Sequence, residues 1–197
     1  MALTKLQAVN QMLSTIGEDA VNALNTGVED ADNAEVKLDE VKTDVLAQGW
    51  KINTRRKTIT KDVNNEFVVA GTILSIDTIK QNAHVDVVNK DGKLVDIEND
   101  TTVWGSGTST LYCEIVYDLD FESLPHTLRS FIAARAAREF QNEEIGSANL
   151  EAKATRREME LWAACLADRS LVEDGNPLRD NPTLYQGTYR RNRLFGY

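Results

Sequence analysis

The residues that could carry out chemistry in this chain are few, and they do not match a catalytic motif. Proton transfer would depend on His84 or His126, the two histidines of the sequence, because histidine titrates closest to neutral pH. His84 falls between two strand-like runs, and the position of His126 after a proline favours a surface or helix-terminal residue. No nucleophile elbow, P-loop, dinucleotide-binding or zinc-protease motif accompanies them. The sequence therefore gives no support for a histidine-based active site.

Paired acidic residues offer a second possibility, the two carboxylates of a glycoside hydrolase. The pairs are Asp118 with Asp120 and Glu143 with Glu144. The chain contains 31 acidic residues, so such pairs also arise by chance and solvated acids are favoured. Residues 30–33 (DADN) begin like a calcium loop but lack its glycine and distal glutamate. We expect no catalytic residue, no metal site and no cofactor.

Two cysteines and one glycine-rich turn complete the candidates for chemistry. Cys113 lies in a strand-like stretch and Cys165 in a helix-like stretch, without metal-site spacing or a nearby histidine. Both are predicted to be small buried apolar residues. Residues 105–107 (GSG) lack the lysine of a phosphate-binding loop and are predicted to form a turn.

The C-terminal residues combine aromatic and basic side chains, and they are the strongest candidate for binding. They are Tyr185, Tyr189, Arg190, Arg191, Arg193, Phe195 and Tyr197. Aromatic residues and arginine are enriched at protein interfaces, and they can also stack on and neutralise nucleic acid. The net charge of −9 argues against nucleic-acid binding over the whole surface. We predict a protein-docking tail, with DNA binding through its arginines as the alternative.

The elements that position these residues begin with two helices. Apolar residues recur at spacings of three and four near the start of the chain, which predicts a helix over about 4–17 with Gly17 as its C-cap. The same period predicts a second helix over about 30–48, ended by Gly49.

A region of β character follows from about residue 50 to 119. Runs rich in β-branched and aromatic residues alternate with polar turns, and residues 89–93 (NKDGK) are typical of a hairpin. The runs include residues 67–69 (FVV). Trp50 stands where the helical pattern gives way to the β pattern. Because no convergent polar residues surround it, Trp50 is predicted to be a buried plug rather than a ligand platform.

Two more helices are predicted over about 125–142 and 147–168. Pro125 suits a first helical turn, since the N–H that it lacks would be unpaired there. The last helix opens with a charged half, which is predicted to be solvated or packed against a partner. The fold class is α+β: two N-terminal and two C-terminal helices packed with a mostly antiparallel β domain. We expect one domain over 1–168, an extended tail over 169–197, and no membrane span, because no apolar run approaches about 18 residues.

Five short stretches follow one another in an order typical of a known family. They are residues 8–18 (AVNQMLSTIGE), 48–53 (QGWKIN), 88–96 (VNKDGKLVD), 121–125 (FESLP) and 137–142 (AREFQN). Over roughly residues 6–166 the chain resembles tail tubular protein A, the head-to-tail adaptor family of short-tailed bacteriophages. The residues after 168 match least.

The resemblance implies a structural role in the virion tail, after synthesis in the cytoplasm of the host bacterium. Adaptors of this family form a dodecameric ring beneath the portal, join it to the nozzle formed by tail tubular protein B, and line the DNA channel. The implied partners are further copies of the chain, the portal and the nozzle, with tail fibres as an additional candidate. DNA would pass without specific binding, and no membrane would be contacted. A tail-associated glycan hydrolase remains the alternative function.

Overall fold

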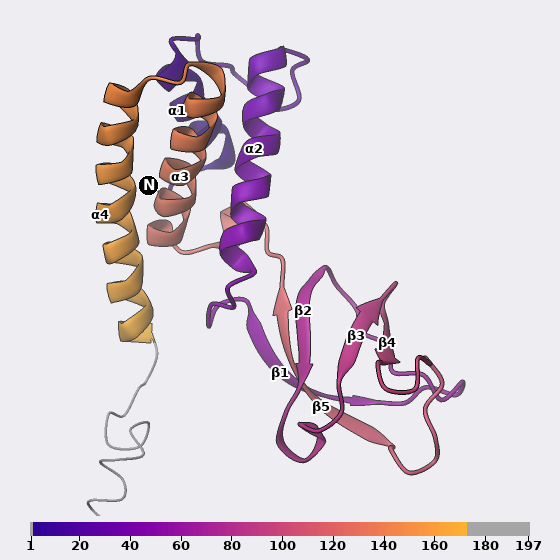
Figure 1. The fold of residues 1–197 in the computed structure, drawn as a ribbon. Helices are drawn as coiled ribbons and strands as arrows, with labels where there is room; N and C mark the ends of the chain where they lie inside the picture. The colour runs from indigo at the N-terminus through magenta and orange to yellow at the C-terminus, as the bar shows by residue number, and fades with distance from the viewer. Residues whose placement is uncertain (1, 173–197) are drawn as a thin grey trace, which may run out of the picture.

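The structure is a computed structural model that describes residues 2–172, and these residues form a helical lobe and a β lobe (Figure 1). Two connections join the lobes. One runs from the end of the second helix into the first strand, and the other returns from the last strand to the third helix. The predicted α+β class is confirmed.

Four helices form the helical lobe: α1 (Lys5–Ile16), α2 (Glu29–Leu46), α3 (His126–Glu144) and α4 (Ala148–Val172). A capping box between Thr4 and Gln7 starts α1, and Gly17 ends it in the left-handed conformation at φ 89°. The helices α1, α2 and α3 pack against one another, whereas α4 packs mainly on α3. Figure 1 shows α2 and α4 on opposite sides of α3.

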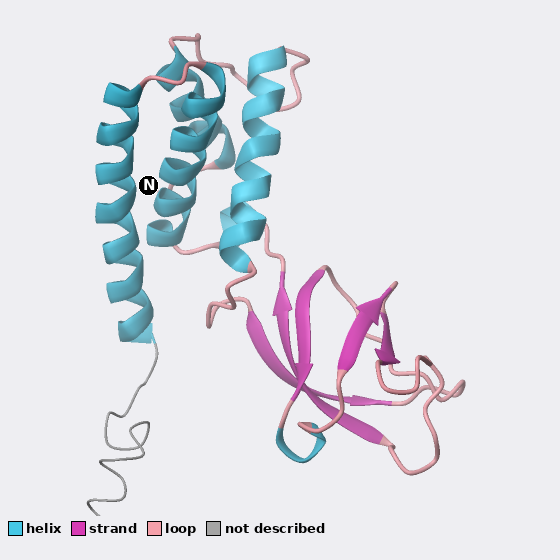
Figure 2. Cartoon of the chain, in the orientation of Figure 1, coloured by secondary structure: helices cyan, strands magenta, loops and turns pink. Residues whose placement is uncertain are grey.

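Five strands form the β lobe (Figure 2). An antiparallel three-stranded sheet has the order β1-β5-β2, from β1 (Thr54–Thr60), β5 (Thr110–Tyr117) and β2 (Ile73–Thr78). The hairpin of β3 (Val87–Lys90) and β4 (Lys93–Asp96) stands beside it. Asp91 and Gly92 turn this hairpin with φ values of 52° and 79°, as the NKDGK motif predicts.

Each lobe has its own hydrophobic core. The helical core is built from the inner faces of α1, α2 and α3 and includes Trp50 and Cys165. The β core surrounds Phe67 and Trp104, whose rings meet edge to face with centroids 5.1 Å apart. Short 3₁₀ helices, η1 (Lys80–Asn82) and η2 (Phe121–Ser123), lie in the connections.

Two predicted helix boundaries are wrong by a few residues. The helix α2 ends at Leu46, so Gly49 does not terminate it; Gly49 instead supplies a positive φ of 74° in the turns that follow. Pro125 is the N-cap of α3 rather than a residue of its first turn, because its ψ of 150° is extended. Its carbonyl still accepts the first helical hydrogen bond, from the N–H of Arg129 at 3.0 Å.

Two further expectations about the elements need correction. Residues 67–69 are not a regular strand: Val68 makes one isolated bridge to Lys93, and the side chains on either side of it are used to fill the β core. The helix α4 continues to Val172, so the predicted tail does not begin at residue 169.

Candidate functional site

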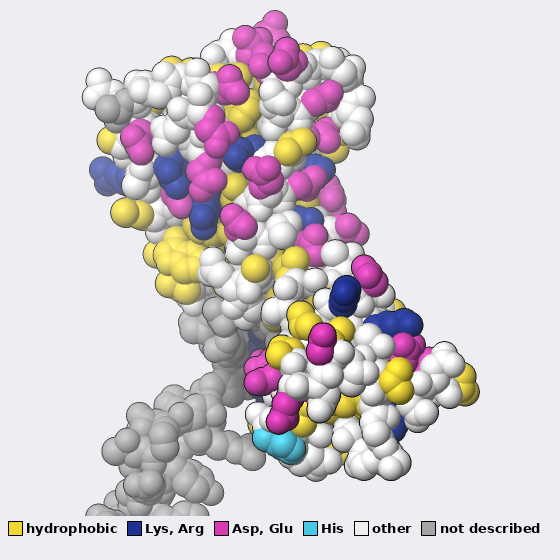
Figure 3. All heavy atoms as spheres, turned by 45° about the vertical axis from the view of Figure 1, so that its right-hand side comes forward, with side chains coloured by type: hydrophobic (Ala, Val, Ile, Leu, Met, Phe, Trp, Pro, Cys, Tyr) yellow, Lys and Arg dark blue, Asp and Glu magenta, His cyan; other side chains and the backbone are white. Residues whose placement is uncertain are grey.

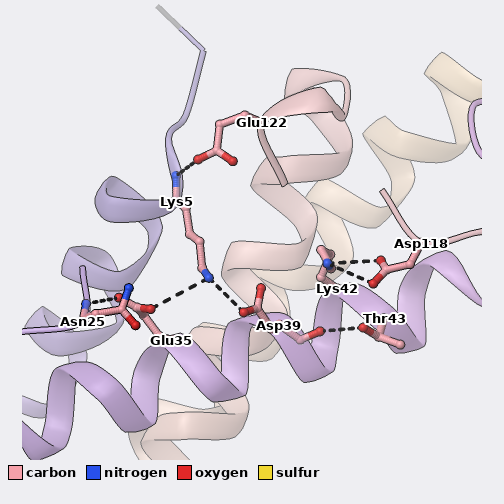
Figure 4. Close-up of polar contacts among 8 residues, drawn as sticks. All are labelled: Lys5, Asn25, Glu35, Asp39, Lys42, Thr43, Asp118 and Glu122. Carbon is pink, nitrogen blue, oxygen red and sulfur yellow. Dashed lines mark hydrogen bonds and ion pairs between the residues drawn. The ribbon is translucent and has the colours of Figure 1, made fainter. Parts of the chain in front are cut away.

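Charged and polar side chains join elements of the helical lobe around Lys5 (Figure 4). The Nζ atom of Lys5 in α1 lies 2.8 Å from the Oδ2 atom of Asp39 and 3.9 Å from the Oε2 atom of Glu35, both in α2. The other carboxylate oxygen of Glu35 accepts the backbone N–H of Asn25 at 2.9 Å. The backbone N–H of Lys5 donates to Glu122 of η2 at 3.1 Å. One lysine thus connects α1, α2 and the segment that leads back from the β lobe.

A second ion pair connects α2 to the returning segment. The ammonium group of Lys42 lies 3.1 Å and 3.3 Å from the two carboxylate oxygens of Asp118, directly after β5 (Figure 4). Both side chains are largely buried, with 11% and 21% of their surfaces exposed. A pair shielded from water in this way is costly to break, because the remaining charge would lack a partner.

Asn53 joins the two connections between the lobes. Its side chain is 1% exposed, and its Nδ2 group donates to the carbonyl of Leu46 at 2.9 Å and to the carbonyl of Tyr117 at 2.8 Å. The backbone carbonyl of Asn53 also accepts the N–H of Tyr117 at 2.9 Å. The end of α2, the start of β1 and the end of β5 are therefore fixed by one residue.

Trp50 packs inside the helical core at the same junction. The side chain is 4% exposed, and its indole N–H donates to the carbonyl of Val45 at 2.8 Å. Its ring meets Trp162 of α4 edge to face at 5.7 Å between centroids, and Trp162 in turn lies 4.9 Å from Phe131 of α3. This geometry agrees with a buried plug. The contact between Trp50 and Trp162 attaches the C-terminal half of α4 to the junction.

The cavity beside Trp50 is small. It holds about 60 Å³ and is lined by apolar side chains together with Lys51, Thr127, Cys165 and Asp168. That volume admits a few water molecules, whereas ligand pockets usually measure about 300–1,000 Å³.

A larger open groove, of about 520 Å³, lies between α3 and α4. Its two arginines are paired with carboxylates of the same helices: Arg138 with Glu158, and Arg135 with Glu139 at 2.9 Å. The hydrogen bond that Arg138 donates to Glu158 raises the pKa of its guanidinium above its usual value. These arginines already have carboxylate partners within the protein, which lessens their capacity to hold an added anion.

The histidines suggested for acid–base chemistry are not brought together. His84 is exposed in the β lobe, and His126 is exposed at the first residue of α3. Within residues 2–172, no cluster of three or more metal-ligating side chains is present.

One acid of each suggested pair has a structural partner in α2. Asp118 binds Lys42, and Glu143 lies 2.8 Å from the Nζ atom of Lys37. The hydrogen bonds that Lys37 donates to Glu143 and Glu40 raise the pKa of its ammonium group well above its usual value. Glu143 therefore ties the end of α3 to α2.

Both cysteines are buried free thiols, as predicted. Cys113 belongs to the β core and Cys165 to the helical core. Burial raises the pKa of each thiol to about 11.

The seven aromatic and basic residues of the predicted docking tail lie between residues 185 and 197, outside the described part of the chain. Of the helices that the structure describes, none has the length and apolar character needed to cross a bilayer.

Asn53 is the residue of this junction that sequence reasoning missed. It stands inside the stretch QGWKIN, but no function was assigned to it. A signal was present, because a short amide side chain beside a helix end is well suited to accept or donate backbone hydrogen bonds.

These contacts define an α+β protein in which the paired charges hold its own elements and lobes together. A family model described as tail tubular protein matches residues 6–173, and the chain belongs to that family. It is accordingly a structural component of a phage virion tail. No curated protein matches the chain significantly.

Proposed function

We propose that the protein is a ring-forming adaptor that joins the portal to the tail nozzle and lines part of the DNA channel. The observation that carries this proposal is the family match over residues 6–173, which spans both lobes. A tail component with two lobes presents separate surfaces to different neighbours, and the buried junction at Asn53 and Lys42 favours a fixed angle between them.

The charge of the chain supports passage of DNA rather than capture. The formal net charge is −9. Phosphate binding depends on lysine and arginine releasing counterions from the nucleic acid. Several cations of the helical lobe are paired with carboxylates, as for Lys37, Lys42 and Arg138. An acidic ring would therefore hold DNA only weakly.

The aromatic and basic residues between 185 and 197 form part of this proposal as the segment that docks to the portal. Their composition is that of an interface anchor. Removal of residues 180–197 should leave the two lobes folded and weaken attachment to the portal.

Assembly of the purified protein tests the proposal. Light scattering after size-exclusion chromatography and negative-stain electron microscopy should show a ring, either for the protein alone or after addition of the portal. The shortened chain should retain the far-ultraviolet circular dichroism of its helices and show a lower occupancy on the portal. A full-length chain that remains monomeric with purified portal would overturn the adaptor role.

A further inference from the structure

The helix α4 lies at the edge of the helical lobe with one side facing away from it. It packs mainly on α3, whereas α1, α2 and α3 all contact one another. Its exposed residues include Arg156, with 84% of its side chain in solvent, and Met159, which is 66% exposed at the rim of the groove between α3 and α4. Toward its C-terminal end, residues 161–167 (LWAACLA) carry no charge, and Ala163, Ala164 and Leu166 are exposed. An apolar helix face of this kind favours a covering partner.

The outward face of α2 has the opposite character. Its five exposed residues are Glu29, Asn33, Val36, Glu40 and Asp44, at successive spacings of four, three, four and four. They form one stripe along the helix, with three acids, no cation and one exposed valine at 59%. Figure 3 shows acidic side chains spread over the part of the helical lobe that this view brings forward.

The charges on the two faces are complementary. On α4, Glu160 lies 3.4 Å from Arg156 and 3.9 Å from Arg157. Among the exposed charged residues that the structure describes on this helix, three cations (Lys153, Arg156 and Arg157) stand against two acids (Glu151 and Glu160). On α2, Glu40 lies 3.0 Å from Lys37, but Lys37 also binds Glu143, so the acids outnumber the lysine. The alanines of α4 permit close approach of another helix beside these charges.

The positions of the two helices fit a head-to-tail contact. Figure 1 shows α2 and α4 flanking α3, and both helices run from N- to C-terminus toward the end of the lobe that meets the β lobe. A closed ring needs two different faces on opposite sides of one subunit. Rotation about the ring axis preserves the axial direction, so two helices that run the same way can lie side by side in neighbouring copies.

We propose that the acidic stripe of α2 in one copy docks on the outward face of α4 in the next copy. This inference rests on the proposed ring and specifies the contact that closes it. Arg156 faces the acidic stripe, and Met159 covers the valine at its centre. The occupant of the α4 face is thus a second copy of the chain.

Charge reversal on each face tests the contact. Glu40→Lys and Arg156→Glu should each weaken assembly by about tenfold in the association constant of the contact, since they place like charges opposite each other. An equimolar mixture of the two variant proteins should recover rings, because each reversed face then meets a face of opposite charge. Native mass spectrometry should find the two variants in equal numbers within the recovered rings.

Two reversals on the β lobe, Glu98→Lys and Lys90→Glu, serve as matched controls. Both residues are exposed, and they belong to the β3–β4 hairpin and the loop after it, which Figure 1 shows well away from α2 and α4. The controls should assemble like the unchanged protein. Variants that form rings as well as the unchanged protein, or a mixture that recovers none, would overturn the α2-to-α4 contact while the ring itself stands. An unchanged protein that forms no ring, alone or with portal, would count against both proposals.

Discussion

The helical lobe and the β lobe differ in how much core each one has. Among the described residues, twenty buried hydrophobic residues form the helical core and eight form the β core. Hydrophobic stabilisation scales with the apolar area removed from water. The helical lobe should therefore supply most of the stability, and the β lobe should open at a lower cost.

The polar contacts differ between the lobes as well. In the helical lobe, Lys5 and Lys37 form ion pairs between separate helices. In the β lobe, aspartates hold the loops locally: Asp62 accepts the backbone N–H groups of Asn64 and Glu66, each at 2.9 Å. These hydrogen bonds lower the pKa of the Asp62 carboxyl. Ion pairs also join separate segments of the β lobe, such as Lys93 with Glu66 at 2.7 Å, but there the cation is 46% exposed. Contacts of these two kinds add little stability, so the β lobe depends strongly on its few core side chains.

Truncation of one large core side chain in each lobe should have the largest effect. Phe67→Ala and Phe140→Ala should each lower the free energy of unfolding of their own lobe by about 3–5 kcal/mol. Each lobe holds one buried thiol, Cys113 or Cys165, with a pKa that burial raises to about 11. At pH 8 the native thiols stay protonated and shielded, so the rate at which a thiol reagent labels each cysteine should report the opening of its lobe.

The expected pattern separates the lobes. Phe67→Ala should speed labelling of Cys113 and leave Cys165 protected, whereas Phe140→Ala should expose Cys165. Val63→Ala is the control, because Val63 is 96% exposed and should change stability by less than about 0.5 kcal/mol. Equal labelling rates for both thiols in every variant would show that the lobes open as one unit, and would contradict the expectation that the β lobe opens at a lower cost.

Loss of the junction amide should have the next largest effect. Asn53→Ala removes the buried donor to the carbonyl of Tyr117 and one of two donors to the carbonyl of Leu46, which keeps the N–H of Gly49 at 3.0 Å. The expected cost is about 2–3 kcal/mol, since an orphaned buried group costs about 1–3 kcal/mol and the loss of the second hydrogen bond adds about 1 kcal/mol. Urea unfolding followed by circular dichroism measures the loss.

The matched control for the junction is Asn64→Ala, which removes an exposed amide within the β lobe. It should cost less than about 1 kcal/mol. If Asn53→Ala costs no more than this control, the two connections are held by backbone contacts alone.

The regular elements could be predicted from the sequence because their signals are local. The three- and four-residue period places α1 to α4 to within a few residues, and NKDGK places the β3–β4 hairpin. The wrong boundaries at Gly49 and Pro125 arise because a positive φ or a fixed φ suits both a helix end and the turn beside it.

The contacts between lobes could not be predicted, because they depend on the arrangement in space. Lys42 and Asp118 are 76 positions apart, and the partners of Asn53 lie in two different elements. The burial of Trp50 was expected from its place at the junction, but its ring partner Trp162 comes from α4. The sequence also does not show that the apolar residues divide into two separate cores, because that depends on which of them meet in space.

Loss of the ion pair between Lys42 and Asp118 should have the smallest effect of the three. Its comparison with an ion pair inside the β lobe, between Arg56 and Glu114, separates a contact at the junction from one within a lobe. Lys42→Met should lower stability by about 1–2 kcal/mol, less than for a fully buried pair because Asp118 retains some access to water. Arg56→Met removes the exposed pair with Glu114 in the β sheet, where 75% of the arginine side chain is in solvent. It should cost less than about 0.5 kcal/mol.

Salt provides the second readout of this comparison. Added salt screens exposed charges far more than buried ones, so 0.5 M NaCl should erase the effect of Arg56→Met and leave most of the effect of Lys42→Met. Unfolding curves at low and high salt give both values. An equal loss for the two variants at both salt concentrations would mean that the junction pair acts as an ordinary surface contact, and the fixed angle between the lobes would then rest on Asn53 and the packing around Trp50.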